Sequence, residues 1–362
     1  MKQPKSGSFG RLRVLTAGAA IALFSTAASV VPANAEPIPD PVAETLQPIE
    51  AVTSENGSKI SRIENYGEQQ LLVYVYSASM DKEVLLDVWR PADTSEPRPT
   101  LYLLNGAGGG EDSATWRYRT DAIDFFKDKN LNVVSPVGGR WSYYTDWEQE
   151  DPVLGVNKWE TFLTKEVPPL IDAALGTNGV NAIAGLSSSG TSVLQLAIEG
   201  DGLYKGVAAY SGCAQTSDPI GQQFVKITTE TWGGGDTRNM WGEDDDPTWV
   251  EKDPYVHAEE LRGMELYISN GNGLPGPYDT LNGPEIDGQV DVLANQIIVG
   301  GVIEAATNYC THNLRDRLVE LDIPATYNFR PSGSHSWGYW QDDLKDSWPV
   351  LAKALGLDAA TE

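Results

Sequence analysis

Cysteine and histidine are scarce in this chain, and this scarcity limits the chemistry that it can carry. The 362 residues include two cysteines, Cys213 and Cys310, and three histidines, and no C-x-x-C spacing occurs. Zinc sites and thiol nucleophiles need more ligands or partners of these types close together. We therefore expect no metal site and no cofactor.

Basic residues are also few. The chain has 26 Lys and Arg against 51 Asp and Glu, which gives a formal net charge of −25. An acidic excess of this size argues against nucleic acid or anionic lipid surfaces as partners. We expect a soluble particle without a nucleic-acid partner, and the sequence does not predict an oligomeric state.

Long apolar runs are absent except near the N-terminus. Four basic residues precede an apolar stretch over residues 14–31, and Ala33-Asn34-Ala35 follows it. This order predicts a secretory signal peptide over residues 1–35 with an A-x-A cleavage site. An uncleaved anchor is the alternative, but Ser25 and Pro32 interrupt the stretch. No later segment approaches the roughly 20 apolar residues that a bilayer span needs, so we expect a secreted or cell-envelope protein with no anchor after cleavage.

The two cysteines of an exported chain are expected to pair. An even number of cysteines in an oxidising compartment favours one disulfide, here between Cys213 and Cys310. Two buried free thiols are the alternative.

The pattern of apolar residues predicts an α/β-hydrolase fold with a mostly parallel central sheet and helices on both faces. Residues 36–60 are rich in Pro and Glu and are expected to form a solvated lead segment. A single catalytic domain is expected over residues 61–355, with 215–252 as an inserted excursion. Strands are predicted at 71–77, 83–89, 100–104, 131–134, 180–184, 207–210, 266–269 and 326–329, and helices near 120–127, 159–175, 191–198 and 290–319.

Ser187 lies where a predicted strand gives way directly to a predicted helix. The run Gly185-Leu186-Ser187-Ser188-Ser189-Gly190 is typical of a nucleophile elbow, although the second glycine comes one residue later than usual. The strained turn of an elbow requires small residues around the serine. Ser188 and Ser189 are rival nucleophiles, but only Ser187 has a glycine two positions before it. Ser187 is therefore predicted to carry out acyl transfer.

A serine nucleophile needs a histidine base and an acid that holds this base. His335 follows the last predicted strand, which agrees with the chain order Ser, acid, His of this fold. His257 and His312 lie in charged surroundings and are expected to be solvated. The pattern alone does not choose the acid, for which five residues are candidates: Asp279, Glu285, Asp287, Asp291 and Glu304.

The oxyanion hole of this fold uses two backbone N–H groups. One comes from the residue after the nucleophile and one from the loop after the third sheet strand of the fold. Ser188 and Ala107 occupy these positions, and glycines around Ala107 let the chain approach a substrate closely.

These residues resemble the mycolyltransferases of the antigen 85 kind, the exported enzymes that move mycolic acyl chains among trehalose and cell-wall sugars. The resemblance runs from about Leu85 to Leu351. It is carried by LYLLNG at 101–106, PVGGRWSYYTDW at 136–147, KWETFLTKEVP at 158–168, GLSSSG at 185–190, NMWGEDDDPTW at 239–249, SNGNG at 269–273 and PSGSHSWGYW at 331–340.

The resemblance implies roles for single residues. Ser187 is the nucleophile, His335 the base and Glu304 the acid, while Ala107 and Ser188 take the oxyanion positions. Asn105, Gly106 and Trp337 match the part of the family that binds substrate. Mycobacterial members have an aspartate and an arginine where this chain has Asn105 and Gly108.

The implied partners are glycolipid substrates, the trehalose mycolates, and cell-wall sugar acceptors. The acceptor is expected to be a trehalose ester, arabinogalactan or a protein hydroxyl. A secreted carboxylesterase with the same triad and a wall-associated binding protein without turnover are the alternative functions.

Overall fold

The computed structural model describes residues 52–359. The predicted signal peptide and the first part of the lead segment lie outside the described residues.

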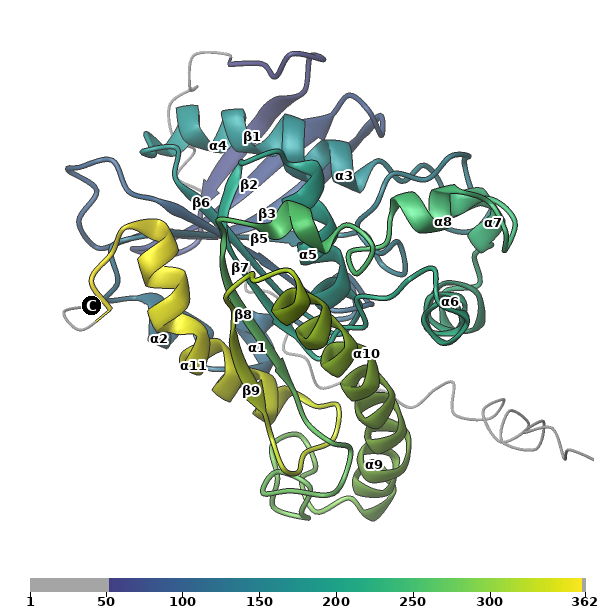
Figure 1. The fold of residues 1–362 in the computed structure, drawn as a ribbon. Helices are drawn as coiled ribbons and strands as arrows, with labels where there is room; N and C mark the ends of the chain where they lie inside the picture. Colours follow the sequence, from purple (N-terminus) through teal and green to yellow (C-terminus); the bar gives the residue numbers. More distant parts are fainter. Residues whose placement is uncertain (1–51, 360–362) are drawn as a thin grey trace, which may run out of the picture. The chain divides into compact units, whose positions relative to one another are not determined.

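One mixed sheet of nine strands forms the centre of the described chain (Figure 1). Its spatial order is β1-β2-β3-β5-β4-β6-β7-β8-β9. The first three strands pair antiparallel, as does β3 with β5, and the pairs from β5 to β9 are all parallel. The strands are β1 (Lys59–Asn65), β2 (Gln70–Ser77), β3 (Lys82–Trp89), β4 (Thr100–Leu104), β5 (Asn132–Val137), β6 (Asn181–Leu186), β7 (Tyr204–Tyr210), β8 (Glu265–Asn270) and β9 (Thr326–Phe329).

The central strands are buried on both faces. All five residues of β4 are buried, with Tyr102 and Leu104 in one apolar cluster and Leu101 and Leu103 in the other. Side chains of a strand alternate between its two faces, so a strand covered on both sides reads as a continuous apolar run. This is the reason that LYLL predicts a buried strand.

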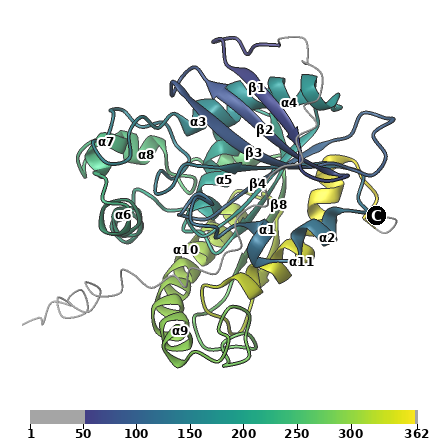
Figure 2. The same ribbon diagram turned by 180° about the vertical axis from the view of Figure 1, so that it is seen from behind.

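Helices cover both faces of the sheet (Figures 1 and 2). On one face, α4 (Val167–Leu175), α5 (Ser188–Glu199) and α10 (Gly301–Glu320) contribute to the larger apolar cluster. On the other face, α1 (Trp116–Arg119), α2 (Ala122–Phe126) and α11 (Trp337–Leu355) contribute to the second cluster. The predicted α/β-hydrolase fold with a mostly parallel sheet is therefore confirmed.

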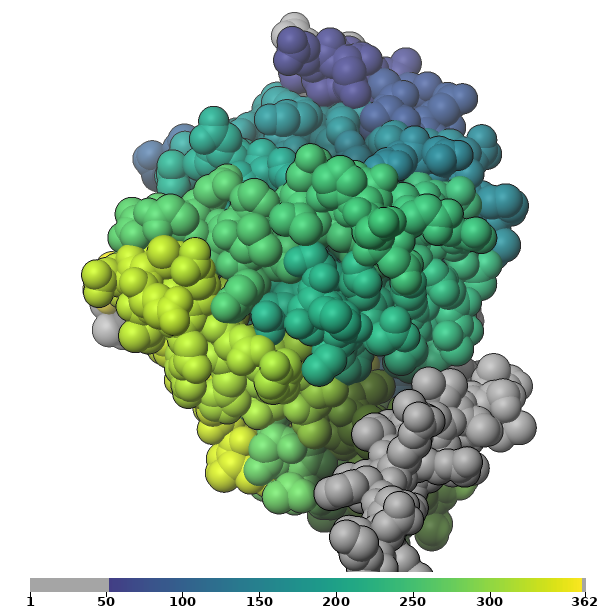
Figure 3. Space-filling model, turned by 45° about the vertical axis from the view of Figure 1, so that its right-hand side comes forward, coloured from purple at the N-terminus to yellow at the C-terminus, as the bar shows by residue number. Residues whose placement is uncertain are grey.

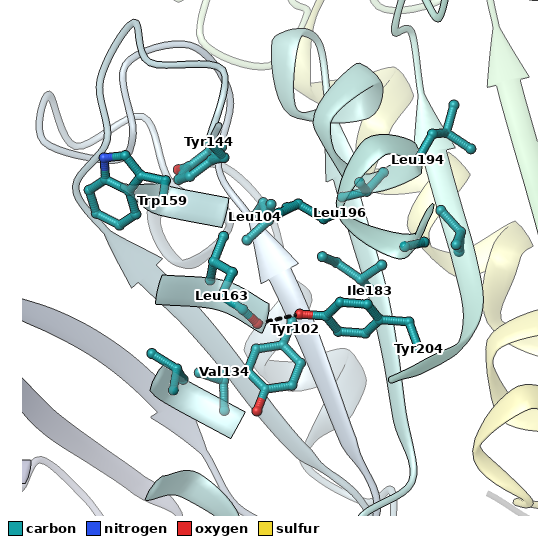
Figure 4. Packing of buried hydrophobic residues seen from close by; sticks show 14 of the residues in the cluster. Tyr102, Leu104, Val134, Tyr144, Trp159, Leu163, Ile183, Leu194, Leu196 and Tyr204 are labelled. Atoms are coloured by element: carbon teal, nitrogen blue, oxygen red, sulfur yellow. Dashed lines mark hydrogen bonds between the residues drawn. The ribbon is translucent and has the colours of Figure 1, made fainter. Parts of the chain in front are cut away.

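Aromatic rings pack among the aliphatic side chains of the larger cluster (Figure 4). Tyr102 and Tyr204 meet edge to face with ring centroids 5.8 Å apart, and the Tyr204 hydroxyl donates to the Leu163 carbonyl at 2.8 Å. Leu163 belongs to η2 (Phe162–Glu166), a π-helical turn between α3 (Trp159–Thr161) and α4. The hydrogen bond satisfies a hydroxyl that would be costly to bury alone.

The excursion over residues 215–252 folds into short helices. They are α6 (Pro219–Lys226), η3 (Ile227–Trp232), α7 (Thr237–Trp241) and α8 (Thr248–Glu251). Its apolar residues share a small cluster with Tyr143 and Trp147, from the loop after β5. On the face drawn in Figure 3, the green surface of the middle of the chain lies beside the yellow-green surface of its C-terminal part.

The prediction of a solvated lead segment is wrong at its C-terminal end. Ser54 and Ser58 are buried, and β1 starts at Lys59. The Asn56 amide donates to Glu166 Oε1 at 2.6 Å, so a buried carboxylate far along the chain holds this polar turn in place. A long-range polar contact of this kind leaves no periodic signal in the sequence.

The expectation that no later segment is long and apolar enough to cross a membrane is also wrong. Together α9 (Val290–Asn295), η5 (Gln296–Gly300) and α10 form a helix over Val290–Glu320 that meets this test by length and composition, and 22% of its most apolar window is buried. One such helix is weak support for a span. Its buried side packs on the sheet through Leu314 and Leu318.

Candidate active site

Ser187 occupies a sharp turn between β6 and α5. Its backbone has φ 58° and ψ −126°, a conformation that non-glycine residues rarely adopt. The Ser187 N–H donates to the Tyr210 carbonyl at 2.8 Å, and the Ser187 carbonyl accepts from the Gly190 N–H at 2.9 Å. The strained backbone is therefore held from both sides, and the serine is presented beyond the carboxyl end of β6.

Close packing explains why the residues around Ser187 are small. A Cβ at Gly185 would lie 2.6 Å from Ser189 Oγ, and a Cβ at Gly190 would lie 2.6 Å from the Tyr210 carbonyl oxygen. Ser189 is fully buried, and its hydroxyl bonds to the backbone of Leu186. Ser189 is thus a structural residue, and the late glycine of the motif is the one that lets α5 pass β7.

His335 lies in the loop between β9 and α11 and joins the serine to a carboxylate. Its Nε2 is 2.8 Å from Ser187 Oγ, and its Nδ1 is 2.7 Å from Glu304 Oε2. A carboxylate only accepts hydrogen bonds, so Nδ1 carries the proton and Nε2 is free to accept the proton of the serine. The His335 backbone N–H donates to the Gly300 carbonyl at 3.2 Å, which fixes the loop against η5.

Glu304 is fully buried in the first turn of α10. Its second oxygen, Oε1, accepts hydrogen bonds from Ser211 Oγ at 2.8 Å, Asn270 Nδ2 at 3.0 Å and the Gly271 N–H at 2.5 Å. A carboxylate held by several donors keeps one orientation without water. Of the acid candidates in the sequence, Glu304 is the one that bonds to His335.

Other acid candidates have different partners. Glu285 pairs with Arg119 at 3.1 Å. Asp279 is buried and accepts from Tyr339 OH at 2.6 Å, from Gln296 Nε2 at 2.8 Å and from the hydroxyl of Ser334, the residue before His335. Asp279 therefore ties the histidine loop to η5.

Arg330 and Asp343 extend this network, and the sequence does not point to either. Arg330 Nη2 lies 3.2 Å from Glu304 Oε1, and its Nη1 pairs with Asp343, a fully buried carboxylate on α11. No motif distinguishes these charges from surface residues, so only long-range contacts reveal them. Ser211 follows β7 directly and Asn270 ends β8, and their contacts with Glu304 do not follow from the sequence either.

The loop after β4 lies directly beside the nucleophile. A Cβ at Gly106 would lie 3.8 Å from Ser187 Cβ, and the Ala107 carbonyl accepts from the Trp141 N–H at 2.6 Å. Ser188 is the first residue of α5, where a helix leaves its N–H groups without intrahelical partners. The structure thus brings the predicted oxyanion residues to the same side of the sheet as Ser187.

Asn105, which the resemblance places among the substrate-binding residues, has a side chain that bonds within the protein, and its predicted contact with substrate stays a prediction. Asn105 is fully buried: its amide donates to the Pro136 carbonyl at 3.1 Å, and its oxygen accepts from the Trp116 N–H at 3.2 Å. It therefore holds the loop and does not face solvent. Trp337 is half-buried and packs edge to face on Trp116 and Trp340, so its predicted contact with substrate stays a prediction.

A disulfide joins the turn after β7 to α10. Cys213 and Cys310 are bonded with Cα atoms 5.0 Å apart, 97 residues apart in sequence. The predicted pairing is present, and it anchors the helix that carries Glu304.

Comparisons with known proteins identify the family. Residues 77–351 match the esterase family. The diacylglycerol acyltransferase/mycolyltransferase Ag85B of Mycobacterium avium is 30% identical over 292 residues, which are 78% of this chain and 82% of that protein. The chain belongs to the antigen 85 mycolyltransferases of the esterase family. Ag85A of Mycobacterium leprae, another antigen 85 protein, is 31% identical over 293 residues, again 78% of this chain and 82% of that protein.

A solved mycobacterial structure has the same fold. Mycobacterium tuberculosis MPT51 (FbpC1) superposes with a TM-score of 0.62 at 22% identity, over 86% of this chain and 100% of that one. The Ag85A and Ag85B relatives confirm the resemblance seen in the sequence motifs. As an antigen 85 relative, the protein is an acyltransferase or esterase-like enzyme.

Proposed function

We propose that this protein is an exported serine acyltransferase that moves mycolyl or corynomycolyl chains from a trehalose monoester to a second trehalose monoester or a cell-wall sugar. The observation that carries the proposal is the continuous chain of hydrogen bonds from Ser187 through His335 to Glu304. The description of its antigen 85 relatives as mycolyltransferases supports the acyl group and the transfer.

The first half-reaction forms an acyl-serine. Ser187 Oγ attacks the ester carbonyl carbon while His335 Nε2 takes the hydroxyl proton, and Glu304 stabilises the resulting imidazolium. The N–H groups of Ala107 and Ser188 hold the negative oxygen of the tetrahedral intermediate. The intermediate collapses when the sugar oxygen leaves with the proton of the imidazolium.

The second half-reaction repeats these steps with a new alcohol. A sugar hydroxyl gives its proton to His335 as it attacks the acyl-serine, and Ser187 recovers its proton when the new ester leaves. Transfer dominates over hydrolysis only where an oriented acceptor outcompetes water.

Incubation of the purified protein with trehalose monomycolate tests the proposal. We expect trehalose dimycolate by mass spectrometry, none with Ser187→Ala, and a rate lower by about 10³- to 10⁴-fold with Glu304→Gln, which keeps the shape but not the charge. Ser95→Ala, in the exposed loop between β3 and β4, is the matched control and should keep the parental rate.

The products separate the alternatives. Free mycolic acid without new glycolipid would identify a carboxylesterase with the same triad. A protein that neither turns over the ester nor reacts with a fluorophosphonate at Ser187 would be a binding protein. Export is tested separately, by sequencing the N-terminus of the protein recovered outside the cell, which we expect to begin at Glu36.

A further inference from the structure

We propose that Arg330 and Asp343 form a charge pair that sets how strongly Glu304 holds the imidazolium of His335. Both are then positioning residues, because they act through Glu304 and touch no reacting atom. The inference rests on the proposed triad and goes beyond it, since it names what controls the acid.

The geometry places one guanidinium between two buried carboxylates. Arg330 is 12% exposed, and both Glu304 and Asp343 have fully buried side chains. The Arg330 backbone N–H donates to the Asn270 carbonyl at 2.9 Å, and its guanidinium lies 5.3 Å from the ring centre of Tyr339. The side chain is therefore fixed from its backbone to its charged end.

Two ionised carboxylates away from water need compensating charge. Burial alone would lower the pKa of Arg330, but Asp343 and Glu304 outweigh this effect and keep that pKa above its ordinary value. Burial raises the pKa of Asp343 to about 6, although Arg330 opposes the rise. The guanidinium is thus charged, and it opposes the protonation that burial favours at Asp343.

Arg330 and His335 use different oxygens of the same acid. Arg330 donates to Oε1 of Glu304, and His335 donates to Oε2. Without Asp343, the positive charge of Arg330 would offset part of the negative charge of Glu304. The carboxylate would then stabilise the imidazolium of His335 less. Asp343 counters this by neutralising the guanidinium, so the pair leaves Glu304 with nearly its full charge toward His335.

Other titratable groups pack near the pair and bond elsewhere. Asp279 holds Ser334 and Tyr339, and Asp346 accepts from Asn328 at 3.3 Å. Burial and the charge of Asp343 raise the pKa of the Tyr267 hydroxyl. The single and double variants change Arg330 and Asp343 alone, so a comparison among them isolates the pair.

The test is the pH dependence of the rate at which a fluorophosphonate labels Ser187. This readout needs a neutral His335 but no mycolyl substrate. In Arg330→Gln, Glu304 loses a competing donor, so we expect the acid midpoint of the labelling rate to rise by about 0.5–1 pH unit. In Asp343→Asn, no carboxylate neutralises the guanidinium, so this midpoint should fall by a similar amount. The double variant removes both charges and should return to within about 0.2 pH unit of the parent.

Arg330→Lys covers the case in which a single variant does not fold. It keeps the charge, so we expect the parental midpoint with a labelling rate lowered severalfold. Shifts of the two single variants in the same direction, or a double variant displaced as far as Arg330→Gln, would overturn the inference. Absence of labelling of Ser187 in the folded parent would instead overturn the proposed function.

Discussion

Trp340 stands edge-on against the imidazole of His335, with ring centroids 4.8 Å apart and planes at 88°. The same indole donates its N–H to Ser211 Oγ at 3.1 Å, and Ser211 in turn donates to Glu304 at 2.8 Å. One buried side chain of α11 therefore orients the base by contact and the acid through a hydroxyl.

Trp340→Phe separates these two roles. It keeps an aromatic edge near His335 but leaves the Ser211 hydroxyl without its donor. We expect hydrolysis of a p-nitrophenyl ester to fall by about fivefold, the equivalent of one hydrogen bond, with little change in the urea midpoint. Trp340→Ala also opens a cavity, and its free energy of unfolding should fall by about 3–5 kcal/mol. Equal rates for Trp340→Phe and the parent would show that the indole N–H is dispensable.

Gly190→Ala should damage the elbow. Its Cβ would lie 2.6 Å from the Tyr210 carbonyl and 3.1 Å from the Gly212 nitrogen, both backbone atoms that cannot turn away. We expect a loss of about 1–3 kcal/mol in unfolding free energy together with most of the activity. Gly67→Ala is the control, because its Cβ would meet nothing closer than 3.8 Å. Parental activity in Gly190→Ala would contradict the packing explanation of the late glycine.

Removal of the disulfide should destabilise the protein strongly. The bond between Cys213 and Cys310 spans 97 residues. In the chain-entropy description, a disulfide that closes a loop of about 100 residues raises the free energy of unfolding by roughly 4–5 kcal/mol. We expect the Cys213→Ser/Cys310→Ser variant to unfold in urea at a clearly lower concentration, and dithiothreitol to shift the parent but not the variant. An unchanged midpoint in the variant would count against a structural role.

Asp279 should stabilise the protein in a pH-dependent way. Burial would raise its pKa, but donors from Ser334, Tyr339, Gln296 and the Gly276 N–H more than offset this and lower it. A carboxyl whose pKa is lowered by folding stabilises above its ordinary pKa, and this stability is lost as the pH falls through the folded value.

Asp279→Asn tests this sign. We expect it to lower the unfolding free energy at pH 7 by about 1–3 kcal/mol, and the difference from the parent to shrink as the pH approaches about 3. Asp287→Asn, on the exposed part of the same loop, should have no effect at either pH. If the difference in unfolding free energy between Asp279→Asn and the parent stayed constant with pH, the charge of Asp279 would not be the source of the stabilisation.

The local pattern of apolar and turn residues predicts most of the fold. The predicted bounds of β4 and β9 agree with the structure. For β4 the reason is an apolar run ended by turn residues, which marks a strand covered by helices on both faces. Helix α11 has no prediction, since its apolar positions are interleaved with acidic residues after His335. β1 has no prediction either. It begins at Lys59, near the end of the predicted lead segment, directly after buried serines that bond within their own turn, next to Asn56 and Glu166.

The pattern of the sequence predicts only those site residues that stand at expected places in the strand order of the fold. Ser187 and His335 follow from a turn motif and from strand order. Glu304 follows from the family resemblance, because the turn after β8 contains no acid and the carboxylate arrives from a helix more than 30 residues later. Arg330, Asp343 and the buried state of Asn105 depend on contacts between distant segments, and these leave no local signature.

The disulfide also restrains the helix that carries Glu304. Ser187 and His335 lie in turns next to the sheet, whereas Glu304 lies on α10, which the bond from Cys310 to Cys213 cross-links to the turn after β7. Before these thiols are oxidised, polar contacts and packing alone locate the acid. Oxidation of the pair therefore adds a cross-link that restrains the helix positioning the acid.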